Sequence, residues 1–90
     1  MSEQIVVAQK AVSKPMFEAE LAGALSRYES TVIFVLETFD GGESVVKRVN
    51  AKSLIGMLSL ELKGGETLTV STYGADEKAA AEKVKELLTK

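Results

Sequence analysis

The segment between residues 31 and 49 most constrains the fold, because it contains two β-rich runs separated by a short glycine turn. Thr31 to Glu37 is apolar, of strand length, and rich in β-branched and aromatic residues. Asp40-Gly41-Gly42 follows, and these residue types tolerate a positive φ angle. Ser44 to Val49 then resumes an extended pattern. We therefore predict a long β-hairpin.

Two more strands are predicted, one on each side of this hairpin in the sequence. Ile5 to Ala8 is a β-branched run flanked by polar residues, and it is typical of a strand. A loop should follow it as far as Pro15, which cannot donate a helical amide. Near the other end, apolar residues alternate with hydroxyls from Glu66 to Thr72, so this strand should have one face in water.

Three segments have helical character. From Met16 onward, apolar side chains repeat at helical spacing, namely Phe17, Leu21, Leu25 and Tyr28. A short helix is predicted from about Ser53 to Leu60. A last helix is predicted from Ala75 to Lys90, where Asp76 and Glu77 in the first turn suit the helix dipole. One face of this last helix is apolar, with Ala80, Val84, Leu87 and Leu88. The predicted order is β-α-β-β-α-β-α. This order indicates an α+β fold in which three helices cover one face of a four-stranded, mainly antiparallel sheet.

Composition narrows the class of protein. A chain of 90 residues predicts one domain spanning residues 1–90. Eleven basic and thirteen acidic side chains give a net charge of -2, which provides no broad basic surface for nucleic acid. Cysteine and histidine are both absent from the sequence, so no metal or other cofactor is expected. The first four residues do not resemble a signal peptide and no apolar run has membrane length, so we expect a cytoplasmic protein.

Two motifs resemble one known family. The stretch from Asn50 to Leu60 carries a serine at the start of a short apolar helix, and Gly74 to Glu77 begins the last helix. Together with the element order, these segments resemble the HPr family, the small histidine-phosphorylated carriers of the sugar phosphotransferase system. The resemblance runs over most of the chain and implies an open-faced β-sandwich of four antiparallel strands and three helices.

The main departure from that family is the missing carrier histidine. An alignment without gaps from the first strand places the histidine position at Lys14, whereas an alignment on the proline places it at Val12. Neither residue provides the imidazole nitrogen that forms a labile phosphoramidate. Lys14 is a solvated loop cation or, with the first amides of the following helix, a group that contacts an anion. The resemblance thus indicates a non-catalytic variant with an unusually long hairpin.

Ser53 has a structural and a regulatory interpretation. As a helix N-cap, its oxygen accepts a backbone amide proton, which says nothing about signalling. In the family that this chain resembles, Ser53 matches the serine that HPr kinase/phosphorylase modifies in Gram-positive bacteria. A phosphate there would face the positive end of the helix dipole, with Lys52 adjacent in sequence, so that the fold would be retained.

The short helix also suggests a docking surface. Leu54, Ile55 and Leu58 share one side of it, while Met57 and Leu60 can point toward the core. In the family, the matching side chains form an exposed patch used by enzyme I, by the kinase and by the transcription regulator CcpA. An apolar patch beside a switchable charge favours protein docking, with Lys14 and Lys52 contributing to recognition.

Three functions are thus open at this point. The first is a regulatory adaptor that acts through Ser53 and protein partners, as a monomer or a weak dimer. The second is a phosphocarrier with a non-histidine acceptor. The third is a binding module that reuses the scaffold for an unrelated partner, with the hairpin at residues 38–44 as its centre. The fold alone does not decide among them.

Overall fold

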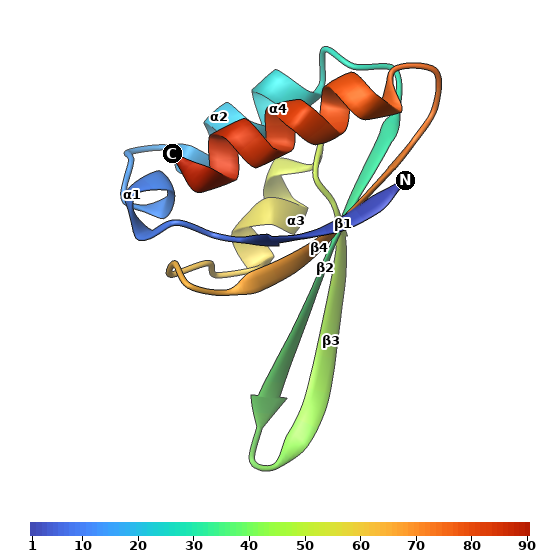
Figure 1. Cartoon of the computed structure of the whole chain (residues 1–90). Coiled ribbons are helices and arrows are strands. Elements are labelled where there is room, and N and C mark those ends of the chain that lie inside the picture. Colours follow the sequence, from blue (N-terminus) through green and yellow to red (C-terminus); the bar gives the residue numbers. More distant parts are fainter.

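A computed structural model of the chain describes all 90 residues except the side chain of Asp40. Four strands form one antiparallel sheet in the order β1-β4-β2-β3, with bounds β1 Ser2–Val6, β2 Thr31–Asp40, β3 Glu43–Asn50 and β4 Thr67–Tyr73. The helices are α1 Gln9–Val12, α2 Phe17–Leu25, α3 Leu54–Ser59 and α4 Glu77–Thr89. Figure 1 shows the longer helices on one face of the sheet, while the β2–β3 hairpin projects away from them.

The core lies between that face of the sheet and the helices. On β2 the buried side chains alternate, and Phe34 and Leu36 lie opposite Val70 and Leu68 of β4. The helices contribute their predicted stripes, with buried side chains at Phe17, Leu21 and Leu25 of α2 and at Ala80, Val84 and Leu88 of α4. Each large side chain buried here contributes roughly 1.5–3 kcal/mol. The predicted α+β architecture is confirmed.

The N-terminal segment differs from the prediction. β1 runs from Ser2 to Val6, earlier in the sequence than the predicted strand from Ile5 to Ala8. Its polar residues can pair with β4 because one face of this edge strand stays in water. Gln9 to Val12 forms the one-turn helix α1 where a loop was expected. Ala11 is fully buried, so packing holds a turn too short to be stable by propensity alone.

The predicted long hairpin is confirmed and is longer than the sheet that supports it. β2 pairs with β4 only as far as Leu36, opposite Leu68. The β2–β3 ladder continues beyond this point to Asp40, opposite Glu43. Residues 37–46 therefore form a two-stranded ribbon, which Figure 1 shows extending away from the body of the molecule.

Asp76 connects the start of α4 to the loop between α2 and β2. Its carboxylate accepts hydrogen bonds from the amides of Glu29 and Ser30, at 3.0 and 2.9 Å, and from the Ser30 hydroxyl. The Ser30 hydroxyl and then the Glu29 amide lower the pKa of Asp76 below its usual value. A Cβ on Gly74 would lie 2.7 Å from the Ser30 oxygen, so only glycine permits this approach. The sequence predicted a dipole role for Asp76 but not this connection.

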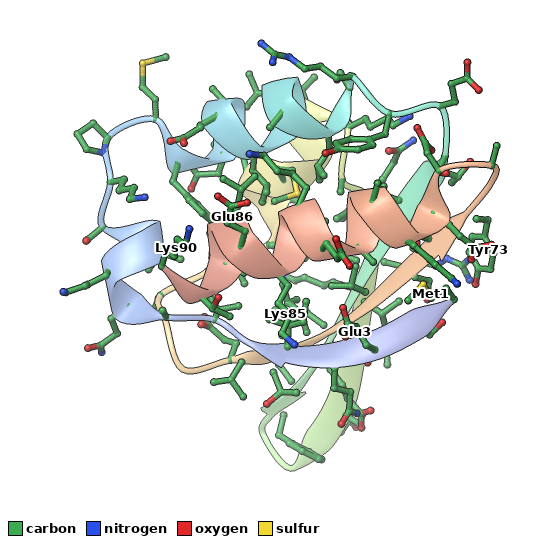
Figure 2. All side chains as sticks on the ribbon, turned by 45° about the horizontal axis from the view of Figure 1, so that its top comes forward. Met1, Glu3, Tyr73, Lys85, Glu86 and Lys90 are labelled. Atoms are coloured by element: carbon green, nitrogen blue, oxygen red, sulfur yellow. The ribbon has the colours of Figure 1, made fainter. Side chains whose placement is uncertain are left out.

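Among the described residues, the ion pairs lie at the N-terminus and along α4. The amino group of Met1 donates to the carbonyl of Thr72 at 3.0 Å and lies 3.1 Å from the carboxylate of Glu77. Figure 2 shows Met1 beside the Tyr73 end of β4 and shows Glu86 and Lys90 toward the end of α4. Glu86 and Lys90 form a surface ion pair of 3.2 Å, which stabilises the fold little.

Candidate functional site

Ser53 is exposed and caps helix α3. Its backbone is extended, with φ -93° and ψ 116°, and its hydroxyl oxygen accepts a hydrogen bond from the amide of Gly56 at 3.2 Å. The amide of Met57 donates to the Ser53 carbonyl at 2.9 Å and begins the helical ladder. The capping prediction is confirmed. The Oγ atom makes this one hydrogen bond among the described residues, so it is open to the surface.

Helix α3 divides its apolar residues between the core and the surface. Met57 and Leu60 are 1% and 2% exposed, as the spacing predicted. Leu54, Ile55 and Leu58 are 45%, 83% and 53% exposed, and we call these three side chains the docking face. A Cβ on Gly56 would lie 3.4 Å from the Cβ of Val49, an ordinary van der Waals contact, so α3 lies close to β3 at this point. The predicted patch is therefore exposed and directly follows Ser53.

Two lysines fix α3 to its surroundings. The ammonium of Lys52 donates to the carbonyl of Tyr28 at 2.6 Å, just beyond the end of α2. The ammonium of Lys47, on β3, donates to the carbonyl of Ser59 at 3.1 Å, at the end of α3. Both cations lie where helix C-termini favour positive charge. Lys52 is therefore a structural link as well as a neighbour of Ser53, and the contact of Lys47 was not predicted because it depends on tertiary packing.

Lys14 is exposed and lies in the connection between α1 and α2. Together with Phe17, Glu20 and Leu87 it borders a shallow hollow near the start of α2. The Lys52 ammonium lies beyond the other end of α2, and this nine-residue helix is roughly 14 Å long. Val12, the alternative histidine position, is half-buried and packs against the core. The predicted site residues thus fall into a cluster at α3 and a separate exposed lysine.

The described part of the chain contains neither a metal-binding cluster nor a helix able to span a membrane. Among the described residues, no three histidine, cysteine, aspartate or glutamate side chains gather where they could hold a metal ion. In the same part of the chain, no helix combines the length and apolar character needed to cross a bilayer. A hollow of about 610 Å³ lies beside the ribbon and is lined by Phe39, Val45, Lys47, Leu60 and Lys63 among others.

Comparison with known proteins gives similarities at the level of sequence and of fold. A sequence model of the PTS-HPr family, described as "PTS HPr component phosphorylation site", matches residues 3–90. The HPr-like protein Crh of Halalkalibacterium halodurans is 50% identical over 36 residues, which cover 40% of this chain and 43% of that protein. The alignment with this curated relative thus spans less than half of the relative's length.

Solved structures share the fold over nearly the whole chain. The phosphocarrier protein HPr of Bacillus anthracis str. Ames has a TM-score of 0.77 and 22% identity, covering 99% of this chain and 96% of that one. HPr-C-His of Thermoanaerobacter tengcongensis gives 0.75 and 23%, with 98% and 90% covered. The histidine-containing phosphocarrier protein of Mycoplasma gives 0.74 and 17%, with 97% and 90% covered. These structures confirm the predicted open-faced sandwich, and with the match over residues 3–90 they place the chain in the HPr family.

Proposed function

We propose that this chain is a non-catalytic regulatory adaptor of the sugar phosphotransferase system or of carbon catabolite control, acting in the cytoplasm. A kinase of the HPr kinase/phosphorylase type modifies Ser53, and a regulator similar to CcpA then binds the modified surface. Enzyme I is a further candidate partner. The proposal depends mainly on one observation, which is that an exposed Ser53 directly precedes the exposed docking face. The local identity with Crh supports the link to catabolite control.

A phosphoryl relay through histidine is not available to this chain. The sequence contains no histidine, and a labile phosphoramidate requires a nucleophilic imidazole nitrogen. The exposed ammonium of Lys14 has no lone pair with which to attack phosphorus. Adaptor function requires neither group, because it depends on recognition by a partner.

In the modification step, the Ser53 oxygen attacks the γ-phosphorus of ATP. The new O–P bond forms as the bond between this phosphorus and the oxygen of the ADP leaving group breaks, and a base of the kinase removes the hydroxyl proton. The product adds about 1.5–2 negative charges at neutral pH. Since the Gly56 amide already points at this oxygen, the phosphate meets the positive end of α3 and the fold is retained.

The modified surface combines a charge with an apolar contact. The docking face supplies three large side chains that a complementary pocket on a partner can desolvate. The phosphate at Ser53 supplies charge-assisted hydrogen bonds to arginine or lysine side chains of that partner. Neither half contributes high affinity alone, so binding depends on modification.

The test is incubation of the purified protein with HPr kinase/phosphorylase and ATP, beside a genuine HPr as positive control. We expect phosphate on Ser53 and no phosphate on Ser53→Ala. Ser59→Ala is the matched control, because Ser59 is an exposed serine at the other end of α3, and it should be labelled normally. If genuine HPr is labelled and this chain is not, the proposal is wrong. A parallel incubation with enzyme I and phosphoenolpyruvate should give no label, and a label there would instead support a phosphocarrier.

A further inference from the structure

The ribbon formed by residues 37–46 has no third strand to support it. Beyond Leu36 the sheet consists of β2 and β3 alone, and a two-stranded hairpin is only marginally stable in water. The ribbon also exposes large apolar side chains, with Phe39 77%, Val45 39% and Val46 59% exposed. The outer edge of β3 pairs with no other strand of the sheet. Such an edge is a template for another strand.

We propose that two copies of this chain pair through residues 43–47 of β3, antiparallel and about a two-fold axis, with Val45 opposite Val45 of the second copy. The ribbon then becomes a four-stranded sheet in the order β2-β3-β3-β2. This inference does not depend on phosphorylation of Ser53.

The direction of the side chains restricts the register. Val45 lies opposite Thr38 and Lys47 lies opposite Leu36, so both point toward the helix side of the sheet. The contact between the Lys47 ammonium and the Ser59 carbonyl agrees with this direction. Residues that lie opposite each other in an antiparallel pair point to the same face of the sheet. A two-fold axis perpendicular to the sheet keeps each face the same in both copies, so an odd-numbered residue of β3 can lie opposite only an odd-numbered residue of the second β3.

Charge then selects one register. With Val45 at the axis, Glu43 of each copy lies opposite Lys47 of the other, which gives two opposite-charge pairs. A register centred on Val46 places Val45 opposite Lys47, and one centred on Ser44 places Glu43 opposite Val45. A register centred on Lys47 places like charges together. In the selected register Gly42 lies beside Arg48 of the second copy, and a glycine there has no side chain to clash.

Charge exchange tests both the interface and its register. We expect concentration-dependent dimerisation in sedimentation equilibrium. Glu43→Lys and Lys47→Glu should each raise the dissociation constant by roughly tenfold or more, because each change makes two attractive cross-strand pairs repulsive. The double variant, Glu43→Lys with Lys47→Glu, should restore the wild-type constant. Glu3→Lys, on the opposite edge strand β1, is the matched control and should leave the constant unchanged.

Cysteine substitution gives an independent measurement in a chain that has no cysteine. Val45→Cys should form a disulfide-linked dimer under mild oxidation, since the paired Cα atoms of antiparallel strands lie within bridging distance. Val46→Cys should link far less, because it does not oppose its own copy. Circular dichroism verifies the fold of each variant. If the protein is a monomer at every concentration up to the millimolar range, the proposal is wrong. The outer edge of β3 would then be available for pairing with a strand of another protein. A dimer that does not respond to charge exchange also overturns the proposal.

Discussion

Substitution of neighbouring residues on α3 tests whether the docking face is free to bind. Met57 is 1% exposed, so Met57→Ala should lower the free energy of unfolding by about 3 kcal/mol, within the usual range of 2–5. Ile55 is 83% exposed, so its truncation loses only about 0.4 kcal/mol of apolar burial. Alanine regains a few tenths of a kcal/mol through its helix propensity. Ile55→Ala should therefore change stability by less than about 0.5 kcal/mol in either direction.

Urea unfolding followed by circular dichroism measures both variants, with the slope against denaturant checked for each. In thermal unfolding, Met57→Ala should lower the midpoint by roughly 12–24 °C, whereas Ile55→Ala should lower or raise it by a few degrees at most. A loss above about 1 kcal/mol for Ile55→Ala would refute the reasoning, since it would mean that the side chain is packed within the fold. A stable Ile55→Ala variant then allows partner binding to be measured without a folding defect.

Two further predictions concern groups that hold the site and its scaffold. Ser53→Ala should lower the free energy of unfolding by about 1 kcal/mol in urea, whereas Ser53→Asp keeps an acceptor at the N-cap and should preserve it. Equal stability of Ser53→Ala and wild type would mean that the cap contributes nothing. Because hydrogen bonds lower the pKa of Asp76 in the folded state, its carboxylate should stabilise the protein at neutral pH, and this contribution should disappear as the pH falls below about 4. Asp76→Asn should therefore be less stable than wild type in urea at neutral pH, with a difference that shrinks in acid, and a difference independent of pH would contradict this account.

The sequence predicted the elements whose pattern is local. Apolar spacing located α2 and α4, and the Asp40-Gly41-Gly42 turn located the hairpin. The turn carries Gly41 and Gly42 at φ 60° and 86°, which is the conformation that these residues favour. In α3, the spacing separated buried Met57 from exposed Ile55, because residues two positions apart on a helix point to nearly opposite sides.

Features that depend on distant contacts were not predictable in this way. The one-turn helix α1 exists because Ala11 is buried, and no local signal reveals that burial. Asp76 binds Glu29 and Ser30, which are 47 and 46 residues away in sequence. The sequence shows only that Lys52 precedes Ser53, whereas in the structure its ammonium donates to the Tyr28 carbonyl. Such contacts depend on which elements meet, and composition and periodicity do not contain that information.

The two lysine contacts that hold α3 have a consequence for how a partner can recognise it. A helix of six residues is too short to persist in water, because nucleation costs more than so few hydrogen bonds return. Its conformation is maintained by the bonds from Lys52 to Tyr28 and from Lys47 to Ser59, and by the buried Met57. A peptide with the sequence of residues 50–60 would therefore be a flexible chain, with its apolar side chains free to point in any direction. Under the proposed function, a partner of this surface must therefore recognise the folded domain, and local unfolding around α3 would abolish the contact.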